Sequence, residues 1–143
     1  ILLLFSLLLY LTRLKCEAGW EPHGGNCYYF NTNKSSWTDS RRSCVGQKSD
    51  LVKIDSREEQ SRLRGLMEDD EDKFWIGLTD SGEEDEWLWV DGSALDQRFV
   101  GCEDTLVCLK NSCWYDRGCD YPQKSICEKT CLSCWRPMKV LKI

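Results

Sequence analysis

The sequence is poor in histidine, and it carries no excess of positive charge. A single histidine, His23, among 143 residues leaves too few imidazoles for a His-based metal site and disfavours a Ser-His-Asp hydrolase. The 19 Lys and Arg residues face 24 Asp and Glu residues, so the net charge is −5, which disfavours a surface that neutralises nucleic-acid phosphates. We also find no nucleophile–base pair and no phosphate-binding loop. These absences argue against an enzyme and against a nucleic-acid partner.

Long apolar runs are confined to the N-terminus. Residues 1–11 read ILLLFSLLLYL, which is shorter than the roughly 20 apolar residues that cross a bilayer but matches the hydrophobic region of a signal peptide. The chain does not begin with Met. We therefore interpret residues 1–15 as the remnant of a signal peptide or of a type II membrane anchor that continues upstream. Either interpretation predicts an extracellular location, in a secreted or a type II membrane protein.

Cysteine, in contrast, is abundant. Ten cysteines in a chain of this length are typical of an oxidising compartment, where disulfides persist. Only Cys131 and Cys134 have the short spacing of a zinc-binding pair, and no second pair matches them. The sequence therefore predicts a disulfide-linked extracellular domain over residues 16–129, followed by a cysteine-containing tail of unknown role over residues 130–143.

Local patterns along this domain predict a mixture of helices and strands. Aromatic residues alternate with turn residues over Trp20–Asn33, which indicates a hairpin. Ser36 and Ser56 each open a capping box and predict two helices. The apolar residues expected on their buried faces are Trp37, Cys44 and Val45 in the first helix and Leu63, Leu66 and Met67 in the second. Strands are expected at Leu51–Ile54, Phe74–Leu78, Trp87–Gly92, Leu106–Leu109 and Ser125–Cys127. This order indicates an α+β fold.

Cysteines and aromatic motifs also follow one another in a distinctive order. They are Cys16, Gly19-Trp20, Cys27-Tyr28-Tyr29-Phe30, Trp37, Cys44, Leu51, Trp75-Ile76-Gly77-Leu78, Trp87-Leu88-Trp89, Asp91-Gly92, Cys119 and Ile126-Cys127-Glu128. The set resembles the long form of the animal C-type lectin-like domain. The resemblance implies two helices packed on short antiparallel sheets and held together by disulfides. It also implies that Trp37, Trp75 and either Trp87 or Trp89 belong to the core.

The resemblance further implies which cysteines pair. Cys16 would pair with Cys27, and Cys44 would pair with Cys127. The second bridge closes a long loop, which on a chain-entropy model stabilises the fold by roughly 4 kcal/mol. A third bridge would join Cys119 to Cys108 or to Cys102. Four cysteines are then left unassigned: Cys113, Cys131, Cys134 and whichever of Cys102 and Cys108 does not pair with Cys119.

In family members that bind sugars, one calcium ion is held by a Glu-Pro-Asn or Gln-Pro-Asp motif and by a Trp-Asn-Asp motif. Calcium needs six to eight oxygen ligands. This chain has neither loop triplet and no proline between Pro22 and Pro122, and Trp114-Tyr115-Asp116 stands in place of the last motif. The resemblance leaves a group of ligand-binding candidates: Glu103, Asp104, Trp114, Tyr115 and Asp116.

A second calcium site of the family draws on acidic residues after the Trp-Ile-Gly-Leu motif, where Asp80 and Glu84 stand here. We prefer to interpret these residues as a solvated acidic hairpin, because calcium requires more oxygen ligands. The candidate metal ligands are therefore Asp80, Glu84, Glu103 and Asp116, and we expect that calcium is not required. Separately, Asn33-Lys34-Ser35 is a sequon for N-glycosylation.

Together these features predict the recognition domain of a cell-surface or secreted immune-type receptor. Its ligand, a glycan or a protein, would bind without calcium at the face that carries the long loop of the family, which lies here between Gly92 and Cys102. One alternative is a calcium-dependent carbohydrate-binding lectin. Another is a secreted toxin-like or matrix subunit that forms a disulfide-linked homodimer.

The homodimer alternative makes a separate prediction. An unpaired cysteine would give a covalent dimer on a non-reducing gel that disappears when thiol is added. A band at the monomer mass under both conditions would contradict this alternative.

Overall fold

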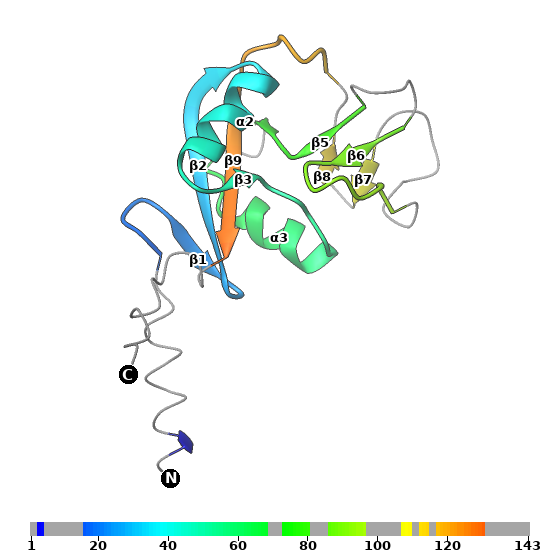
Figure 1. The fold of residues 1–143 in the computed structure, drawn as a ribbon. Coiled ribbons are helices and arrows are strands. Elements are labelled where there is room, and N and C mark those ends of the chain that lie inside the picture. The colour runs from blue at the N-terminus through cyan, green and yellow to red at the C-terminus, as the bar shows by residue number, and fades with distance from the viewer. Residues whose placement is uncertain are drawn as a thin grey trace, which may run out of the picture.

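The described part of the domain forms two helices and three small sheets (Figure 1). The computed structural model describes residues 3–4, 16–68, 73–80, 86–96, 107–109, 112–114 and 117–130. Most of the N-terminal segment 1–15 and residues 131–143 of the tail lie outside this part. Among the described residues, no helix combines the length and the apolar character that crossing a membrane requires. The expected α+β class is confirmed.

The main sheet is built around one strand, β9 (Gln123–Thr130). On one side, β9 pairs antiparallel with β2 (Asn26–Ser35), which in turn pairs with β1 (Glu21–His23) in the predicted hairpin. On the other side, β9 pairs antiparallel with β3 (Asp50–Leu51) and parallel with β4 (Phe74–Trp75). The sheets are antiparallel as expected except at β4, which runs parallel to β9 because the chain reverses direction through the helix between β3 and β4.

Two small hairpins lie to one side of the main sheet (Figure 1). One joins β5 (Leu78–Thr79) to β6 (Leu88–Trp89), and the other joins β7 (Val107–Leu109) to β8 (Ser112–Trp114). The strand expected over Phe74–Leu78 is interrupted after Trp75. There the Gly77 N–H donates to the Val52 carbonyl and the Gly77 carbonyl accepts from the Val90 N–H, both at 2.8 Å. Gly77 therefore links the main sheet to the first hairpin.

Both helices begin at the predicted caps. Helix α2 (Trp37–Gly46) is capped by the Ser36 hydroxyl, which accepts a hydrogen bond from the Asp39 N–H at 3.1 Å. Helix α3 (Arg57–Gly65) is capped in the same way by Ser56, with the Glu59 N–H at 3.1 Å. Each hydroxyl satisfies a backbone donor that has no partner within the first helical turn.

The buried faces of the helices differ from the prediction at two positions. Helix α2 packs through Trp37, Ser40 and Cys44, a spacing that turns Val45 to solvent with 54% of its surface exposed. Leu66 follows the last turn of α3, where its backbone caps the helix, and it is 41% exposed. The expected burial of Val45 and Leu66 is therefore wrong.

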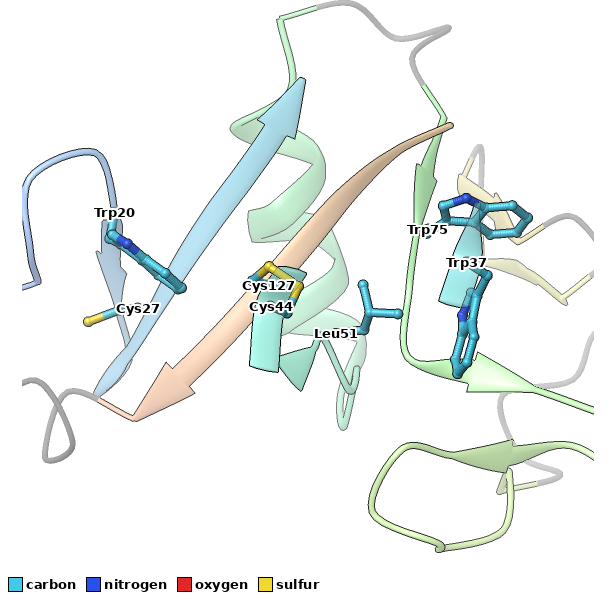
Figure 2. Close-up of a cluster of buried hydrophobic side chains, with 7 residues drawn as sticks. All are labelled: Trp20, Cys27, Trp37, Cys44, Leu51, Trp75 and Cys127. Carbon is cyan, nitrogen blue, oxygen red and sulfur yellow. A yellow bond between two sulfur atoms is a disulfide. The ribbon is translucent and has the colours of Figure 1, made fainter. Parts of the chain in front are cut away.

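The structure contains both disulfides implied by the resemblance. Cys27, Cys44 and Cys127 belong to the first core cluster, where Figure 2 shows the Cys44–Cys127 bond, and Cys16 packs against this cluster. Cys16 pairs with Cys27 at a Cα–Cα distance of 5.7 Å, and Cys44 pairs with Cys127 at 5.5 Å. The second bridge joins α2 to β9 in the middle of the sheet. Cys119, expected in a third bridge, is exposed and has no disulfide partner among the described residues. Because Cys102 and the side chain of Cys108 are outside the described part, the third pairing stays a prediction.

Tryptophan rings fill much of the core. The rings expected to be buried, Trp37, Trp75 and Trp89, are all less than a tenth exposed. The indole N–H of Trp37 donates to the Ile76 carbonyl, and that of Trp75 donates to the Ser35 carbonyl, both at 2.9 Å. A buried indole needs such a partner, since an unsatisfied N–H would cost free energy. These bonds connect α2 and β2 to the segment around β4.

Replacing Gly77 by Ala should destabilise the domain. A Cβ atom at this position would lie 2.8 Å from the Leu51 carbonyl oxygen and 3.0 Å from that of Val52. Because both obstacles are backbone atoms, we expect the free energy of unfolding to fall by about 1–3 kcal/mol in urea titrations followed by tryptophan fluorescence. Gly46→Ala is the matched control, because its Cβ would have no neighbour within 4 Å. Equal stability of the two variants would contradict the prediction.

Candidate ligand-binding site

Of the residues predicted to bind a ligand or a metal, the structure describes Trp114 and Asp80. The other five lie outside the described residues, so their predicted roles remain predictions: Glu84, Glu103, Asp104, Tyr115 and Asp116. The structure does describe the frame that supports this region. That frame consists of the hairpin β5–β6, the turn after it, and the hairpin β7–β8.

Trp114 connects the second hairpin to the first. It pairs with Val107 across β7–β8, and its ring meets the ring of Trp89 edge-to-face with centroids 5.5 Å apart. Trp89 is 5% exposed and belongs to the second core cluster, together with Val52 and Ile54. The half-buried Trp114 therefore has a packing role, and this aromatic pair holds β8 against β6.

Asp80 stands directly after β5 and is half-buried. Nowhere in the described ranges do three or more His, Cys, Asp or Glu side chains come together in a way that could hold a metal ion. Calcium needs six to eight oxygen ligands, so the described residues alone do not fit this ion. The predicted partners of Asp80 are outside these ranges.

The turn after β6 is held by a network of charged groups. The Lys53 ammonium lies 2.9 Å from Asp91 Oδ2 and 3.5 Å from Asp55 Oδ1. The other Asp91 oxygen accepts hydrogen bonds from the hydroxyl and the N–H of Ser93. Hydrogen bonds from Ser93, and then from Lys53, hold the pKa of Asp91 well below its usual range. The hydrogen bond to Asp91 raises the pKa of Lys53. The turn is thereby tied to the end of β3.

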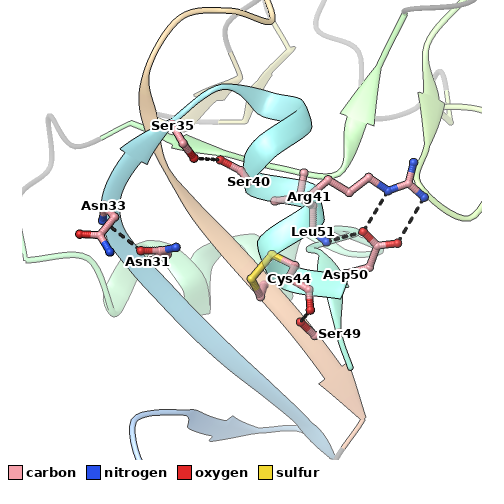
Figure 3. Close-up of a disulfide and its surroundings, with 10 residues drawn as sticks. Asn31, Asn33, Ser35, Ser40, Arg41, Cys44, Ser49, Asp50 and Leu51 are labelled. Atoms are coloured by element: carbon pink, nitrogen blue, oxygen red, sulfur yellow. Dashed lines mark hydrogen bonds and ion pairs between the residues drawn. A yellow bond between two sulfur atoms is a disulfide. The ribbon is translucent and has the colours of Figure 1, made fainter. Parts of the chain in front are cut away.

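A second connection runs from helix α2 to the same turn. The Arg41 guanidinium donates to both carboxylate oxygens of Asp50, at 3.3 and 3.4 Å, as Figure 3 shows. It also donates to the Val90 carbonyl at 3.3 Å. Neither Arg41 nor Lys53 stands out in the sequence, because a single charged residue carries no periodic signal. Their partners became clear only when the elements were placed in space.

Two carboxylates accept hydrogen bonds from the backbone of the segment between β3 and α3. Glu59, 8% exposed, accepts hydrogen bonds from the Tyr28 hydroxyl and from the Asp55 N–H, both at 2.9 Å. Glu128 on β9 accepts one from the Lys53 N–H at 2.8 Å. Burial raises the pKa of Glu128 to about 7, and the nearby carboxylates of Glu59 and Asp55 add to the effect. Burial also raises the pKa of Tyr28.

These contacts define a class of protein. A small disulfide-linked α+β core supports two hairpins whose positions are fixed by side-chain contacts, as in lectin-like recognition domains. The Lectin C-type domain family matches residues 33–129 of the chain. The chain therefore belongs to the C-type lectin family, and the expected fold and ligand-recognition role are confirmed.

Known relatives share the fold over most of this chain. C-type lectin domain family 12 member B of Mus musculus is 34% identical over 128 residues, which cover 80% of this chain and 45% of that protein. The mouse scavenger receptor C-type lectin carbohydrate-recognition domain matches with a TM-score of 0.71 and 33% identity, covering 81% of this chain and 98% of that one. A calcium-independent type II antifreeze protein matches with a TM-score of 0.68 and 28% identity, covering 81% and 95%.

The chain spans about a third to a half of the length of the curated relatives that it matches. Members of this family are recognition proteins rather than enzymes, which agrees with the absence of a catalytic motif in the sequence. The two disulfides fit an extracellular location.

Replacing Glu128 by Gln should make the domain more stable above neutral pH. The carboxyl pKa is 4.5 in the absence of the fold and about 7 in the folded protein, so the folded state binds this proton more tightly. The contribution of Glu128 to stability therefore falls as the pH rises from about 4.5 to about 7. We expect Glu128→Gln to raise the free energy of unfolding at about pH 8 by on the order of 2 kcal/mol. The difference from the wild type should shrink towards about pH 5.

Glu58→Gln is the control, since Glu58 is exposed on α3. Urea unfolding at several pH values gives the measurement. Parallel pH profiles for the wild type and Glu128→Gln would show that the carboxyl group does not titrate as expected.

Proposed function

We propose that residues 16–129 form the extracellular recognition domain of a cell-surface or secreted immune-type protein. The domain binds a glycan or a protein ligand at the face formed by the loops around β7 and β8, and it catalyses no reaction. The observation that carries the proposal is the anchoring of both hairpins to the core, through Trp89 and Trp114 and through Lys53 and Asp91. A fixed base with variable loops can present contact residues without chemical groups for catalysis.

The contact residues that we propose follow from the resemblance. They are Glu103, Asp104, Trp114, Tyr115 and Asp116. Of these, Trp114 lies on the anchored hairpin, and Tyr115 and Asp116 follow it directly in the sequence. Contact through Tyr115 would suit either ligand, since a phenol ring provides apolar area as well as a hydrogen-bonding hydroxyl.

We propose that binding proceeds without calcium. The loop triplets of the sugar-binding members are missing, and the chain has no proline from residue 23 to residue 121. A calcium-independent protein with 28% identity adopts the same fold, so the fold does not depend on the ion. The alternative, a calcium-dependent lectin, draws support from the carbohydrate-recognition domain that is 33% identical and from the position of Asp80 at the end of β5.

Localisation and assembly are part of the proposal. The N-terminal apolar run supports secretion or an upstream type II anchor. The exposed thiol of Cys119 supports a disulfide-linked homodimer as an alternative state.

Calcium titration by calorimetry and glycan-array binding with and without chelator test this proposal. We expect no saturable calcium binding in the micromolar range. Any bound glycan should remain bound in chelator, and Asp116→Ala should weaken that binding whether or not chelator is present. An array without signal would contradict a glycan ligand and leave the protein ligand as the prediction to be tested. The Gly46→Ala variant serves as a folded control.

Micromolar calcium affinity together with chelator-sensitive retention on mannose or galactose resin would overturn the calcium-independent proposal and support the alternative. In that case Asp80→Asn and Asp116→Asn should both lower calcium affinity.

A further inference from the structure

The sequon Asn33-Lys34-Ser35 lies on a part of β2 that has an open edge. Strand β1 pairs only with residues 26–28 of β2. On the other side, the register with β9 is regular up to Asn31 and then shifts before Ser35. Within the described part of the chain, no strand covers residues 29–35 on the side of β2 opposite β9. An unpaired edge of this kind invites pairing with a second chain.

Asn33 itself stands at the irregular part of the strand and is exposed. Its backbone N–H donates to the Asn31 side-chain oxygen at 3.0 Å. Figure 3 shows the Asn33 side chain on the outer side of β2, away from α2. The carboxamide nitrogen is the atom that N-glycosylation modifies, and here it faces solvent.

The hydroxyl of the sequon is engaged once the fold has formed. Ser35 Oγ lies 2.8 Å from Ser40 Oγ of helix α2, and one of the two hydroxyls donates to the other. Ser35 is half-buried and Ser40 is fully buried. The Ser35 carbonyl also accepts from the Trp75 indole. The enzyme that glycosylates a sequon must recognise this hydroxyl. Once α2 and the β4 segment have packed against β2, the hydroxyl is therefore no longer accessible to that enzyme.

We propose that Asn33 carries an N-linked glycan, added before α2 packs against β2, and that this glycan covers the open edge of β2. The co-reactant is a lipid-linked oligosaccharide diphosphate. The Asn33 carboxamide nitrogen forms a bond to the first carbon of the sugar, the bond from that carbon to the diphosphate oxygen breaks, the nitrogen loses one proton, and the lipid diphosphate leaves.

The glycan would not obstruct the proposed ligand-binding face. Strand β2 lies on one side of β9, and β3 and β4 lie on the other. The hairpins β5–β6 and β7–β8 extend beyond that second side (Figure 1). The proposal therefore requires that the chain enters the secretory pathway, and it does not depend on which ligand the domain binds.

Expression of the full chain behind a secretory signal peptide in eukaryotic cells tests the modification. Cell lysate and medium are both treated with peptide N-glycosidase. We expect the enzyme to increase gel mobility of the wild type and of Ser35→Thr, which keeps the sequon. Asn33→Gln and Ser35→Ala should already have the mobility of the treated protein. Peptide mass spectrometry should find Asn33 converted to Asp with solvent oxygen after digestion.

Two results would overturn the modification. One is a wild-type chain that is insensitive to the glycosidase in both fractions. The other is sensitivity that persists in Asn33→Gln, which would place the glycan elsewhere.

The timing is tested with detergent-solubilised membranes that contain oligosaccharyltransferase. The reduced, unfolded chain should be modified, and the folded, oxidised chain should not. Equal modification of both would overturn the requirement that transfer precedes the packing of α2.

The covering role is tested by light scattering of the glycosylated wild type and of Asn33→Gln at rising concentration. Because Asn33 is exposed, the substitution should leave the free energy of unfolding unchanged. We expect the variant to self-associate at lower concentration. Equal self-association would overturn the covering role.

Discussion

The structure depends on strand β9 and on the disulfide that fixes it. Three strands hydrogen-bond to β9, and Cys127 in its centre is bonded to Cys44 of α2. The bridge spans 83 residues, so it restricts the unfolded chain strongly while joining a helix to the sheet in the folded state. Without β9, the β1–β2 hairpin, β3 and β4 would have no common partner. The last described strand of the chain therefore completes a sheet that begins near its first cysteine.

The N-terminal hairpin is attached to β9 by chemistry as well as by hydrogen bonds. The Lys129 side chain is almost fully buried, with its ammonium 4.1 Å from the centre of the Trp20 ring and 3.2 Å from Glu17 Oε1. A buried ammonium needs such compensation, because desolvation of a charge is costly. The Cys16–Cys27 bridge closes the same hairpin. The Lys129 contacts and this bridge together hold the N-terminal hairpin of the domain next to its C-terminal strand, β9.

The hairpins on the other side are attached differently. They form sheets of their own and reach the core through Gly77, the Trp89–Trp114 contact, and the charged pairs made by Lys53 and Arg41. The first hairpin also packs directly on the core, through the buried Trp89 and the half-buried Leu78. Both hairpins are therefore held by side-chain contacts with the core and not by pairing with β9.

The sequence by itself indicated an oxidising compartment and determined the family, both helix caps and the residues of the two bridges, because cysteine content, capping boxes and an ordered set of motifs are local signals. It also identified Trp37 and Trp75 as buried, whereas the choice between Trp87 and Trp89 and the burial of Trp20 came from the structure. The parallel pairing of β4, the break at Gly77, and the exposure of Val45 and Leu66 were decided by the tertiary structure, since each depends on which element packs alongside. The same holds for the raised pKa of Glu128 and for the partners of Lys53 and Arg41. These contacts join different elements, and only folding brings the charged groups on those elements together.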